Sequence, residues 1–435
     1  MSDTTTPAPE RDQLPQHTTP TWEVELLISG VAVFAMLQLP GWLDNQLFAL
    51  VPRLDSDLAG IVTPLYVYLK SAALILAVTF ALHLMLRAHW IALVGMHSVY
   101  LDGVLWAKLR MGPVRREFEQ RRHGSAAESI ERADNRATVV FAIGVMLASR
   151  LIQLSALVAL LFALITAILT LAGAQVNLTL AFGICFLAII LLMLLARRID
   201  QQFGQRLQPE GLPRRLLAGT FNVLSHTGVG RRSEVMALLA SHGSERRINV
   251  LATVTILAVL LGVAFGLNTL EEPEHSGSYA LFPQSIDASR MLRSAHYDDQ
   301  RDPLHDRPTP FVQSAVIDGP YLRLTVPYQP KLDAPAQRAA CGRALALAEG
   351  VARSDALLAC LTRLHALMLD GQALATVHYD VGSDPRTDRP ALLAMIDIRG
   401  LASGRHLLRV ARASTADAVQ PGAMAGKDDM IVFWR

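Results

Sequence analysis

The stretch LIQLSALVALLFALITAILTLAG, residues 151–173, decides the fold class because it carries no charged side chain over its whole length. A helix needs about 20 apolar residues to cross a hydrocarbon core about 30 Å thick. Four other stretches meet this requirement or nearly so, namely residues 22–39, 61–86, 176–196 and 249–269. The sequence therefore predicts a membrane α-helical bundle of about five transmembrane helices over residues 22–270.

The remainder of the chain has the composition of a soluble protein. Residues 271–435 contain 18 basic and 20 acidic side chains, whereas the whole chain is 51% hydrophobic and only 18% charged. We therefore expect a linker over residues 271–310 and a C-terminal soluble α+β, β-sandwich-like domain over residues 311–435. At the other end, the Thr/Pro-rich residues 1–21 lack the basic and apolar regions of a secretory signal and predict a disordered tail.

The distribution of Lys and Arg predicts the orientation, because cytoplasmic loops next to spans retain positive charge. Along the chain, the four connections between spans carry one, nine, none and nine basic residues. This alternation predicts that the N-terminus and the basic loops 87–150 and 197–248 are cytoplasmic, and that the C-terminal domain is extracytoplasmic. The composition, with 36 Arg against 4 Lys, is typical of GC-rich bacterial genomes and favours a bacterial inner membrane with the domain in the periplasm.

The basic loops are predicted to be helical. Residues 89–106 are apolar enough to suggest a sixth span, but Asp102 and the flanking basic residues favour an interfacial or re-entrant element. Ser125 and Glu128 have the spacing of a capping box, which predicts a helix that runs unbroken into the third span. Residues 213–226 form an amphipathic pattern that suits either an anionic inner leaflet or a neighbouring cytoplasmic helix.

Small residues on two spans predict helix–helix contact faces, because close approach of backbones stabilises helix pairs inside lipid. The faces comprise Ser155, Ala159, Ala163 and Ala167 on the third span and Ala258, Gly262 and Gly266 on the fifth. They pack either within one bundle or against a second copy, so homo-oligomerisation stays open. Cys185 in the fourth span is predicted to be a small apolar packing residue.

Three charged residues lie within or beside the spans, where ionisable groups are costly. Lys70 in the second span lies within snorkelling reach of the interface. Glu25 and Arg150 lie near the same level on the first and third spans, and a pair would neutralise both. The sequence favours a structural role for all three. It contains no series of intramembrane acids, histidines or arginines of the kind that a proton relay requires, which argues against a pump.

The C-terminal domain shows the alternating patterns that are typical of short strands. They cover residues 321–326, 376–380, 391–398, 405–410 and 429–435, and an Asp370–Gly371 turn precedes the second of them. The residues RGLASG, between the third and fourth strands, predict a hairpin. This spacing predicts a small β-sandwich.

Two helices, together spanning residues 335–369, are expected to carry the two cysteines of this domain. The first covers about 335–349, and the second begins after Ser354 and continues to Met368. An antiparallel hairpin brings Cys341 and Cys360 level with each other. Outside the cytoplasm this arrangement predicts a disulfide that closes a loop of about 20 residues. The alternative is a pair of buried thiols.

A search for motifs that name a reaction finds none. The chain contains no P-loop, no H-E-x-x-H zinc motif and no G-x-S-x-G nucleophile elbow. Residues 294–308 gather His and Asp side chains that can hold a divalent cation, but the interspersed Pro and Arg favour a solvated linker. Three histidines near the second span lack a facing histidine on another span, and no basic–aromatic surface suggests nucleic acid. The sequence therefore predicts no cofactor, no metal and no nucleic-acid partner.

These observations favour a non-enzymatic envelope scaffold or sensor. Its extracytoplasmic domain would bind a protein partner or ligand, while the basic inner helices contact membrane lipids, with anionic lipids of the inner leaflet favoured. An oligomeric channel or small transporter, with Gln153, Thr166 and Thr170 lining a path, is the alternative. A membrane-embedded enzyme comes third.

Overall fold

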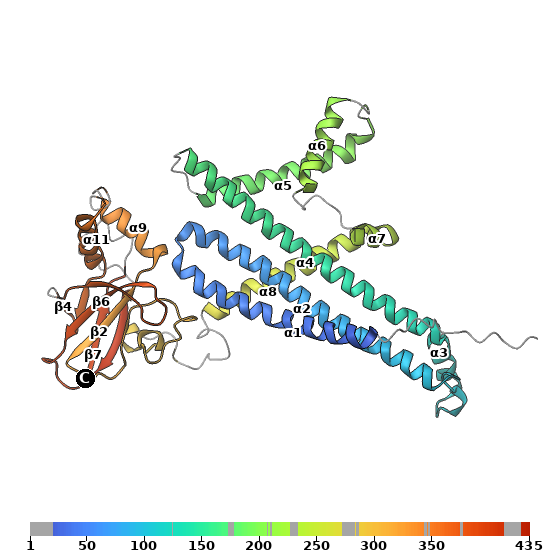
Figure 1. The fold of residues 1–435 in the computed structure, drawn as a ribbon, viewed down its shortest axis with the longest axis horizontal. Helices are drawn as coiled ribbons and strands as arrows, with labels where there is room; N and C mark the ends of the chain where they lie inside the picture. The colour runs from blue at the N-terminus through green and yellow to red at the C-terminus, as the bar shows by residue number, and fades with distance from the viewer. Residues whose placement is uncertain are drawn as a thin grey trace, which may run out of the picture. The chain divides into compact units, whose positions relative to one another are not determined.

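The computed structural model describes two compact units of a mostly helical chain (Figure 1). The described residues are 21–123, 125–172, 178–206, 208, 211–226, 234–271, 283, 287–342, 346, 349–374, 377–412 and 428–435. The first unit, the helical unit, comprises Met1–Gly41, Tyr68–Leu157 and Leu192–Leu260. The second, the sandwich unit, comprises Trp42–Val67, Val158–Leu191 and Leu261–Arg435. Of the predicted tail over residues 1–21, residues 1–20 lie outside the described residues, and Thr21 begins α1.

Eight long or medium helices precede the strands in the described part of the chain. They are α1 (Thr21–Leu50), α2 (Ser56–Val99), α3 (Pro113–His123), α4 (Ala126–Leu171), α5 (Leu178–Phe203), α6 (Leu212–His226), α7 (Glu234–His242) and α8 (Glu245–Glu271). Short 3-10 turns include η1 (Val51–Arg53) and η2 (Trp106–Lys108). Three helical stretches, Ser56–Val99, Ala126–Leu169 and Glu245–Thr269, are long and apolar enough to cross a membrane. The count of about five spans stays a prediction.

The first two helices are longer than the sequence predicts. α1 continues through Pro40 to Leu50, and α2 contains Pro64 and continues without a break to Val99. A proline removes one backbone donor but does not stop a helix whose remaining hydrogen bonds are made. Residues 89–99 of the predicted interfacial or re-entrant element, residues 89–106, are therefore helical, and their position relative to a membrane stays a prediction. They extend α2, which ends at a turn where Gly103 adopts a positive φ of 63°.

The predicted capping box is confirmed. Ser125 Oγ accepts a hydrogen bond from the Glu128 backbone N–H, and the Ser125 N–H donates to Glu128 Oε2, both at 3.2 Å. These two bonds satisfy donors that the first turn of a helix leaves unpaired. The helix that begins here, α4, has 46 residues and includes most of the apolar stretch over residues 151–173.

Close packing of α2 against α4 forms the core of the helical unit. Ala72 and Ile75 on α2 meet Ala148 and Leu151 on α4 in one buried cluster. Gly144 of α4 lies so close to α2 that a Cβ at this position would collide with the side chain of Thr79. Small side chains thus permit the backbone approach that membrane helices use in place of hydrophobic burial.

The C-terminal domain consists of two four-stranded antiparallel sheets (Figure 1). Its strands are β1 (Phe311–Val312), β2 (Tyr321–Pro327), β3 (Leu367–Leu369), β4 (Gln372–Ala373), β5 (Asp380–Ser383), β6 (Pro390–Asp397), β7 (Arg405–Val410) and β8 (Asp429–Trp434). The strand orders are β1-β2-β6-β5 and β4-β3-β7-β8. Inward side chains of both sheets, such as Leu324, Ile396, Leu408 and Phe433, share one buried core. Because alternate residues of each strand face the same side, the period-two patterns place these side chains between the sheets.

The predicted hairpin between residues 391–398 and 405–410 is wrong. β6 pairs with β2 and β5, whereas β7 pairs with β3 and β8, so the connection between them passes from one sheet to the other. Each strand finds more apolar burial by joining a separate sheet across a shared core than by pairing with its sequence neighbour. The strand predicted at residues 376–380 is also displaced, because β5 begins at Asp380.

The segment before β1 is not the solvated linker that the sequence predicts. Its Tyr297 is almost wholly buried, and the Tyr297 hydroxyl donates to the Val432 carbonyl at 2.6 Å. His296 is buried beside it, with Nδ1 2.7 Å from the Pro310 carbonyl oxygen. Residues 287–310 therefore belong to the sandwich, because their apolar and hydrogen-bonding groups find partners there.

The two predicted helices are α9 (Pro330–Ala340) and α11 (Val351–Leu364), and a disulfide joins Cys341 to Cys360 with their Cα atoms 6.1 Å apart. α9 begins earlier than expected because Pro330 occupies a favourable first-turn position. Met368 lies in β3 and not on the second helix, since α11 ends at Leu364. The Asp370–Gly371 turn is confirmed, with both residues at positive φ between β3 and β4.

Candidate functional site

The charged residues predicted within or beside the spans are Glu25, Lys70 and Arg150. Lys70 on α2 and Arg150 on α4 are both half-buried within the helical unit. The side chain of Glu25 lies outside the described residues, so the predicted Glu25–Arg150 pair stays a prediction. Neither described residue lies among the charged network described below.

The predicted small-residue faces are only partly buried. Ser155 is buried and donates to the Ile152 carbonyl of its own helix, whereas Ala163 and Ala167 are exposed. A Cβ built on Gly262 or Gly266 would meet no described atom within 4 Å, apart from the nearby backbone of its own helix. Ala159 is half-buried, and Ala258 is exposed. The small residues that do pack, around Gly144 and Ala148, lie about two turns before the predicted face on α4.

The residues suggested for a polar path are likewise dispersed. Gln153 is exposed, Thr166 is half-buried, and the side chain of Thr170 lies outside the described residues. Cys185, predicted to pack, is exposed on α5. No group of three or more His, Cys, Asp or Glu with metal-binding geometry is found among the described residues.

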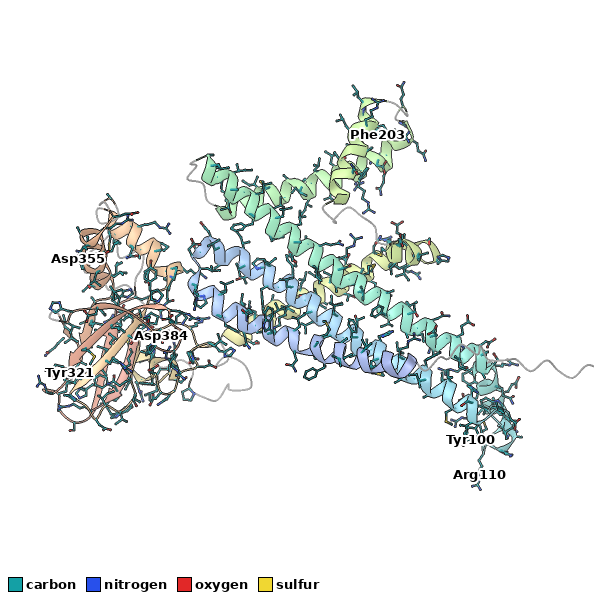
Figure 2. The ribbon with its side chains drawn as sticks, viewed as in Figure 1. Tyr100, Arg110, Phe203, Tyr321, Asp355 and Asp384 are labelled. Atoms are coloured by element: carbon teal, nitrogen blue, oxygen red, sulfur yellow. A yellow bond between two sulfur atoms is a disulfide. The ribbon has the colours of Figure 1, made fainter. Side chains whose placement is uncertain are left out.

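The structure instead gathers charged side chains in the sandwich, around the turn between β5 and β6. Asp384, labelled in Figure 2, follows β5 directly. Its carboxylate accepts hydrogen bonds from the Arg386 backbone N–H at 3.0 Å and from the Thr387 hydroxyl at 2.7 Å. A short acidic side chain that binds its own turn in this way fixes the turn geometry. The turn closes with Asp388 at a positive φ of 54°.

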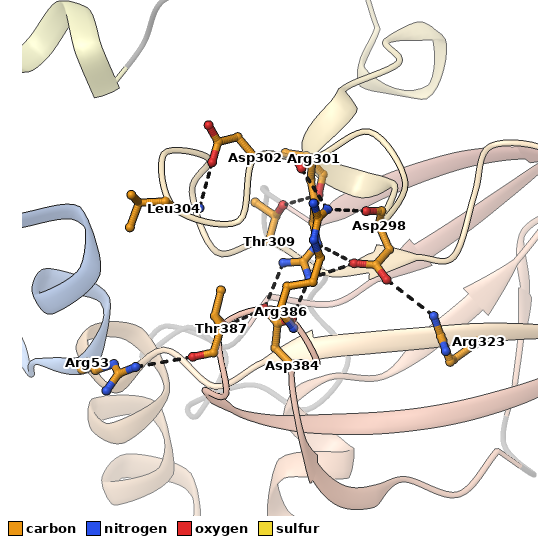
Figure 3. A network of polar contacts seen from close by, with 11 residues as sticks. Arg53, Asp298, Arg301, Asp302, Leu304, Thr309, Arg323, Asp384, Arg386 and Thr387 are labelled. Atoms are coloured by element: carbon orange, nitrogen blue, oxygen red, sulfur yellow. Dashed lines mark hydrogen bonds and ion pairs between the residues drawn. The ribbon is translucent and has the colours of Figure 1, made fainter. Parts of the chain in front are cut away.

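Arg301 binds this carboxylate from the segment before β1, 83 residues away in the sequence (Figure 3). Its Nη1 and Nη2 donate to Asp384 Oδ2 and Oδ1 at 2.9 and 2.6 Å. The side chains of Arg301 and Asp384 are only 7% and 4% exposed. The guanidinium also lies over the Phe311 ring, 3.8 Å from its centroid. A bidentate pair of this kind is directional, and removing one partner would leave the other charge buried.

A second carboxylate completes the network (Figure 3). Asp298 accepts a bond from Arg301 Nε at 2.9 Å, and its other oxygen lies 3.5 Å from Arg323 Nη2. Arg386 donates to the Asp298 and Arg301 carbonyls at 2.6 and 3.1 Å. The network thereby joins three segments: the residues before β1, the strand β2 and the β5–β6 turn.

The electrostatics of the central pair favour its ionised form. Burial alone would raise the pKa of the Asp384 carboxyl, but hydrogen bonds from Arg301, the Arg386 N–H and Thr387 outweigh it and hold this pKa below its ordinary value. Burial likewise opposes the charge of Arg301, but the bonds to Asp384 and Asp298 raise the pKa of its guanidinium. Both groups are therefore charged across the physiological pH range.

Arg389, at the end of the same turn, is the exception. Its side chain is buried, and its Nε has no hydrogen-bond partner. Its Nη2 donates to the Phe48 carbonyl at 3.3 Å. Burial lowers the pKa of its guanidinium, and the charge of Arg53 lowers it further, against an opposing effect from Asp384.

The Trp42–Val67 segment contains the end of α1, the turn η1 and the start of α2, and it contacts this part of the sandwich. Arg53 Nη2 lies 3.4 Å from the Thr387 carbonyl, to which it donates (Figure 3). The Phe48 ring meets the His305 ring edge to face at 5.2 Å, and His305 Nε2 lies 3.2 Å from Asn45 Oδ1. These contacts and the Arg389–Phe48 bond link the end of α1 and the turn η1 to the β5–β6 turn and to the segment before β1.

A small hollow lies beside Arg389. It is lined by Ala295, Arg301, Asp302, Pro303, Asp306, Arg307, Pro308, Thr309, Phe311, Pro327, Asp384 and Arg389. Its enclosed part has about the size of one water molecule, and the rest opens to solvent. The hollow is therefore too small for a whole metabolite but accommodates a single polar atom.

Sequence reasoning missed this site because its members are ordinary surface residue types in segments far apart. Arg301 and Asp298 lie in the predicted linker, and Asp384 and Arg389 lie in a turn between strands. The one available signal is the polar run SDPRTDR, residues 383–389, whose Asp-Pro start indicates a structured turn. Comparison of the chain with protein-family models, curated proteins and solved structures finds no match.

Proposed function

We propose that this chain is a bacterial inner-membrane sensor or scaffold whose extracytoplasmic sandwich binds a ligand or partner and is coupled to the membrane helices. In this proposal about five helices span the bilayer, the N-terminus is cytoplasmic, and the sandwich lies in the periplasm. The basic cytoplasmic helices contact anionic lipid of the inner leaflet.

The observation that carries the proposal is the contact between the Trp42–Val67 segment and the sandwich. This segment contains the end of α1 and the start of α2, so its bonds to the β5–β6 turn connect the domain mechanically to two helices. A ligand can change the conformation of a distant part of a protein only through physical contacts that differ between two conformational states.

Two further observations support the orientation. The connection within Trp42–Val67 holds a single basic residue, Arg53, so the charge rule predicts the same side of the membrane for it and for the sandwich that it contacts. The Cys341–Cys360 disulfide is of the kind that persists in the periplasm and is rare in the cytosol.

Protease accessibility tests the orientation. Protease added to spheroplasts should digest the sandwich and leave the basic loops intact, and inverted membrane vesicles should give the opposite pattern. Digestion of the sandwich only in inverted vesicles would overturn the orientation.

Hydrogen exchange of the full chain in nanodiscs tests the coupling. Arg53→Ala should speed exchange of the backbone amides around Phe48, whereas Arg399→Ala, at an exposed pair elsewhere on the sandwich, should not. Equal exchange in both variants and the parent would contradict coupling. Selective ion flux through purified protein in liposomes would favour the channel instead.

A further inference from the structure

Arg301 and Arg389 are the two buried arginines in the described part of the sandwich, and Arg389 is the one without an ion pair to a carboxylate. Its side chain is 7% exposed, yet its guanidinium makes one long hydrogen bond, to a neutral carbonyl, and Nε makes none. Arg301, equally buried in the same region, is bound by two carboxylates. A buried guanidinium without an anion is costly, and native proteins rarely retain one without a partner.

The charges around Arg389 do not supply that anion. Arg53 and Arg301 both disfavour its charged form, and only Asp384 opposes them. Asp384 is already occupied, because its two oxygens accept the fork of Arg301 together with the Thr387 hydroxyl. The turn therefore leaves Arg389 without a carboxylate of its own.

The hollow beside Arg389 provides a place for the missing anion. Arg301, Arg389 and the Thr309 hydroxyl line it. Three carboxylates also line it, and each accepts hydrogen bonds of its own. Asp384 accepts them from Arg301 and Thr387, and Asp302 from the Leu304 N–H and His305. Asp306 accepts the backbone N–H of Asp302 at 2.8 Å.

We propose that this hollow binds a single phosphoryl oxyanion, with one oxygen entering it to meet the Arg389 guanidinium. The inference rests on the proposed ligand-binding role of the sandwich and names the class of ligand. A guanidinium matches phosphate oxygens with two parallel N–H groups. Arg301, Arg307 and Arg389 line the hollow beside carboxylates that accept bonds of their own, and a phosphate offers these arginines more oxygens than a carboxylate does. The other oxygens stay at the open mouth, within reach of solvent.

The phosphoryl group has two potential sources, a free phosphate and a phospholipid headgroup. Arg53 ends the turn η1, which follows α1, and contacts the same β5–β6 turn, so a headgroup at the end of the membrane helices is one source. The two sources share the chemistry of recognition and differ in the rest of the molecule. Titration with both separates them.

The test uses the full chain in an uncharged detergent and a phosphate-free buffer, titrated calorimetrically with inorganic phosphate and, separately, with dihexanoyl phosphatidic acid. We expect saturable binding of at least one probe. Binding of both indicates a site open to free oxyanions, and binding of the lipid alone indicates a headgroup site. Arg389→Gln should weaken binding at least tenfold, and Arg389→Lys several-fold, because an ammonium lacks the planar fork. Arg399→Gln is the matched control and should bind as the parent does.

Stability without probe distinguishes a binding arginine from a structural one. Because Arg389→Gln removes an unpaired buried charge, its urea midpoint should be no lower than that of the parent. A marked fall of the midpoint, unchanged affinity in Arg389→Gln, or an equal loss in Arg399→Gln would overturn the proposal. If Arg389→Gln does not fold, unchanged affinity in Arg389→Lys is sufficient to overturn the proposal. Absence of binding by both probes overturns the anion site but leaves the sensor proposal, which protease accessibility and hydrogen exchange test.

Discussion

The buried pair of Arg301 and Asp384 gives the sharpest stability prediction. Arg301→Ala removes a guanidinium that is 7% exposed and leaves a carboxylate that is 4% exposed without its cation. Breaking a buried pair in this way costs about 3–5 kcal/mol. Asp384 keeps its bonds from the Arg386 N–H and the Thr387 hydroxyl, so we expect the lower end, about 3 kcal/mol.

The assay is pulse proteolysis of the full chain in urea, which follows loss of the folded sandwich. With a slope of about 2 kcal/mol per M, a loss of about 3 kcal/mol lowers the urea midpoint by about 1.5 M. Arg399→Ala is the matched control, because Arg399 and its partner Asp397 are 65% and 48% exposed. Solvent screens an exposed pair, so the midpoint of this control should stay close to that of the parent.

A double variant separates the pair from its surroundings. Arg301→Ala combined with Asp384→Ala should recover part of the loss, because the buried carboxylate left behind is removed as well. Equal midpoints for Arg301→Ala and Arg399→Ala would refute the reasoning. That result would mean that water reaches Asp384 and that the pair does not hold the turn.

Three further predictions concern the disulfide, the helical core and acid. Replacing Cys341 and Cys360 by Ser should cost about 3 kcal/mol of sandwich stability in the chain-entropy model, and the same urea assay with and without reductant checks this; an unchanged midpoint would contradict it. Gly144→Ala should lower the thermal stability of the helical unit in detergent, because the new Cβ collides with the Thr79 side chain. Adding Thr79→Gly to the same chain should restore part of the lost stability. An unchanged melting temperature in Gly144→Ala would refute the close packing. The depressed pKa of Asp384 stabilises the fold at pH above the ordinary pKa of 3.8, and this stability is lost as the pH falls below that value. The melting temperatures of the parent and Asp384→Asn, followed by Trp fluorescence, should therefore converge in acid. A constant difference between them from pH 6 to pH 3 would contradict this prediction.

The sequence by itself determined the features that depend on neighbouring residues. Apolar length predicts long helices because each crossing must satisfy its own backbone. The Ser125–Glu128 box and the Asp370–Gly371 turn were predictable because their hydrogen bonds and backbone angles lie within a few residues. The Cys341–Cys360 bridge belongs with them, since its two ends lie only 19 residues apart.

Only the tertiary structure decided which distant segments meet. The alternation of residues 391–398 and 405–410 indicates strands but not their partners, and shared core packing assigns them to different sheets. The Arg301–Asp384 pair and the unpaired Arg389 arise in the same way. Opposite charges at a separation of 83 residues have no local signature, because their free energy depends on burial that exists only after the two sheets have closed around one core.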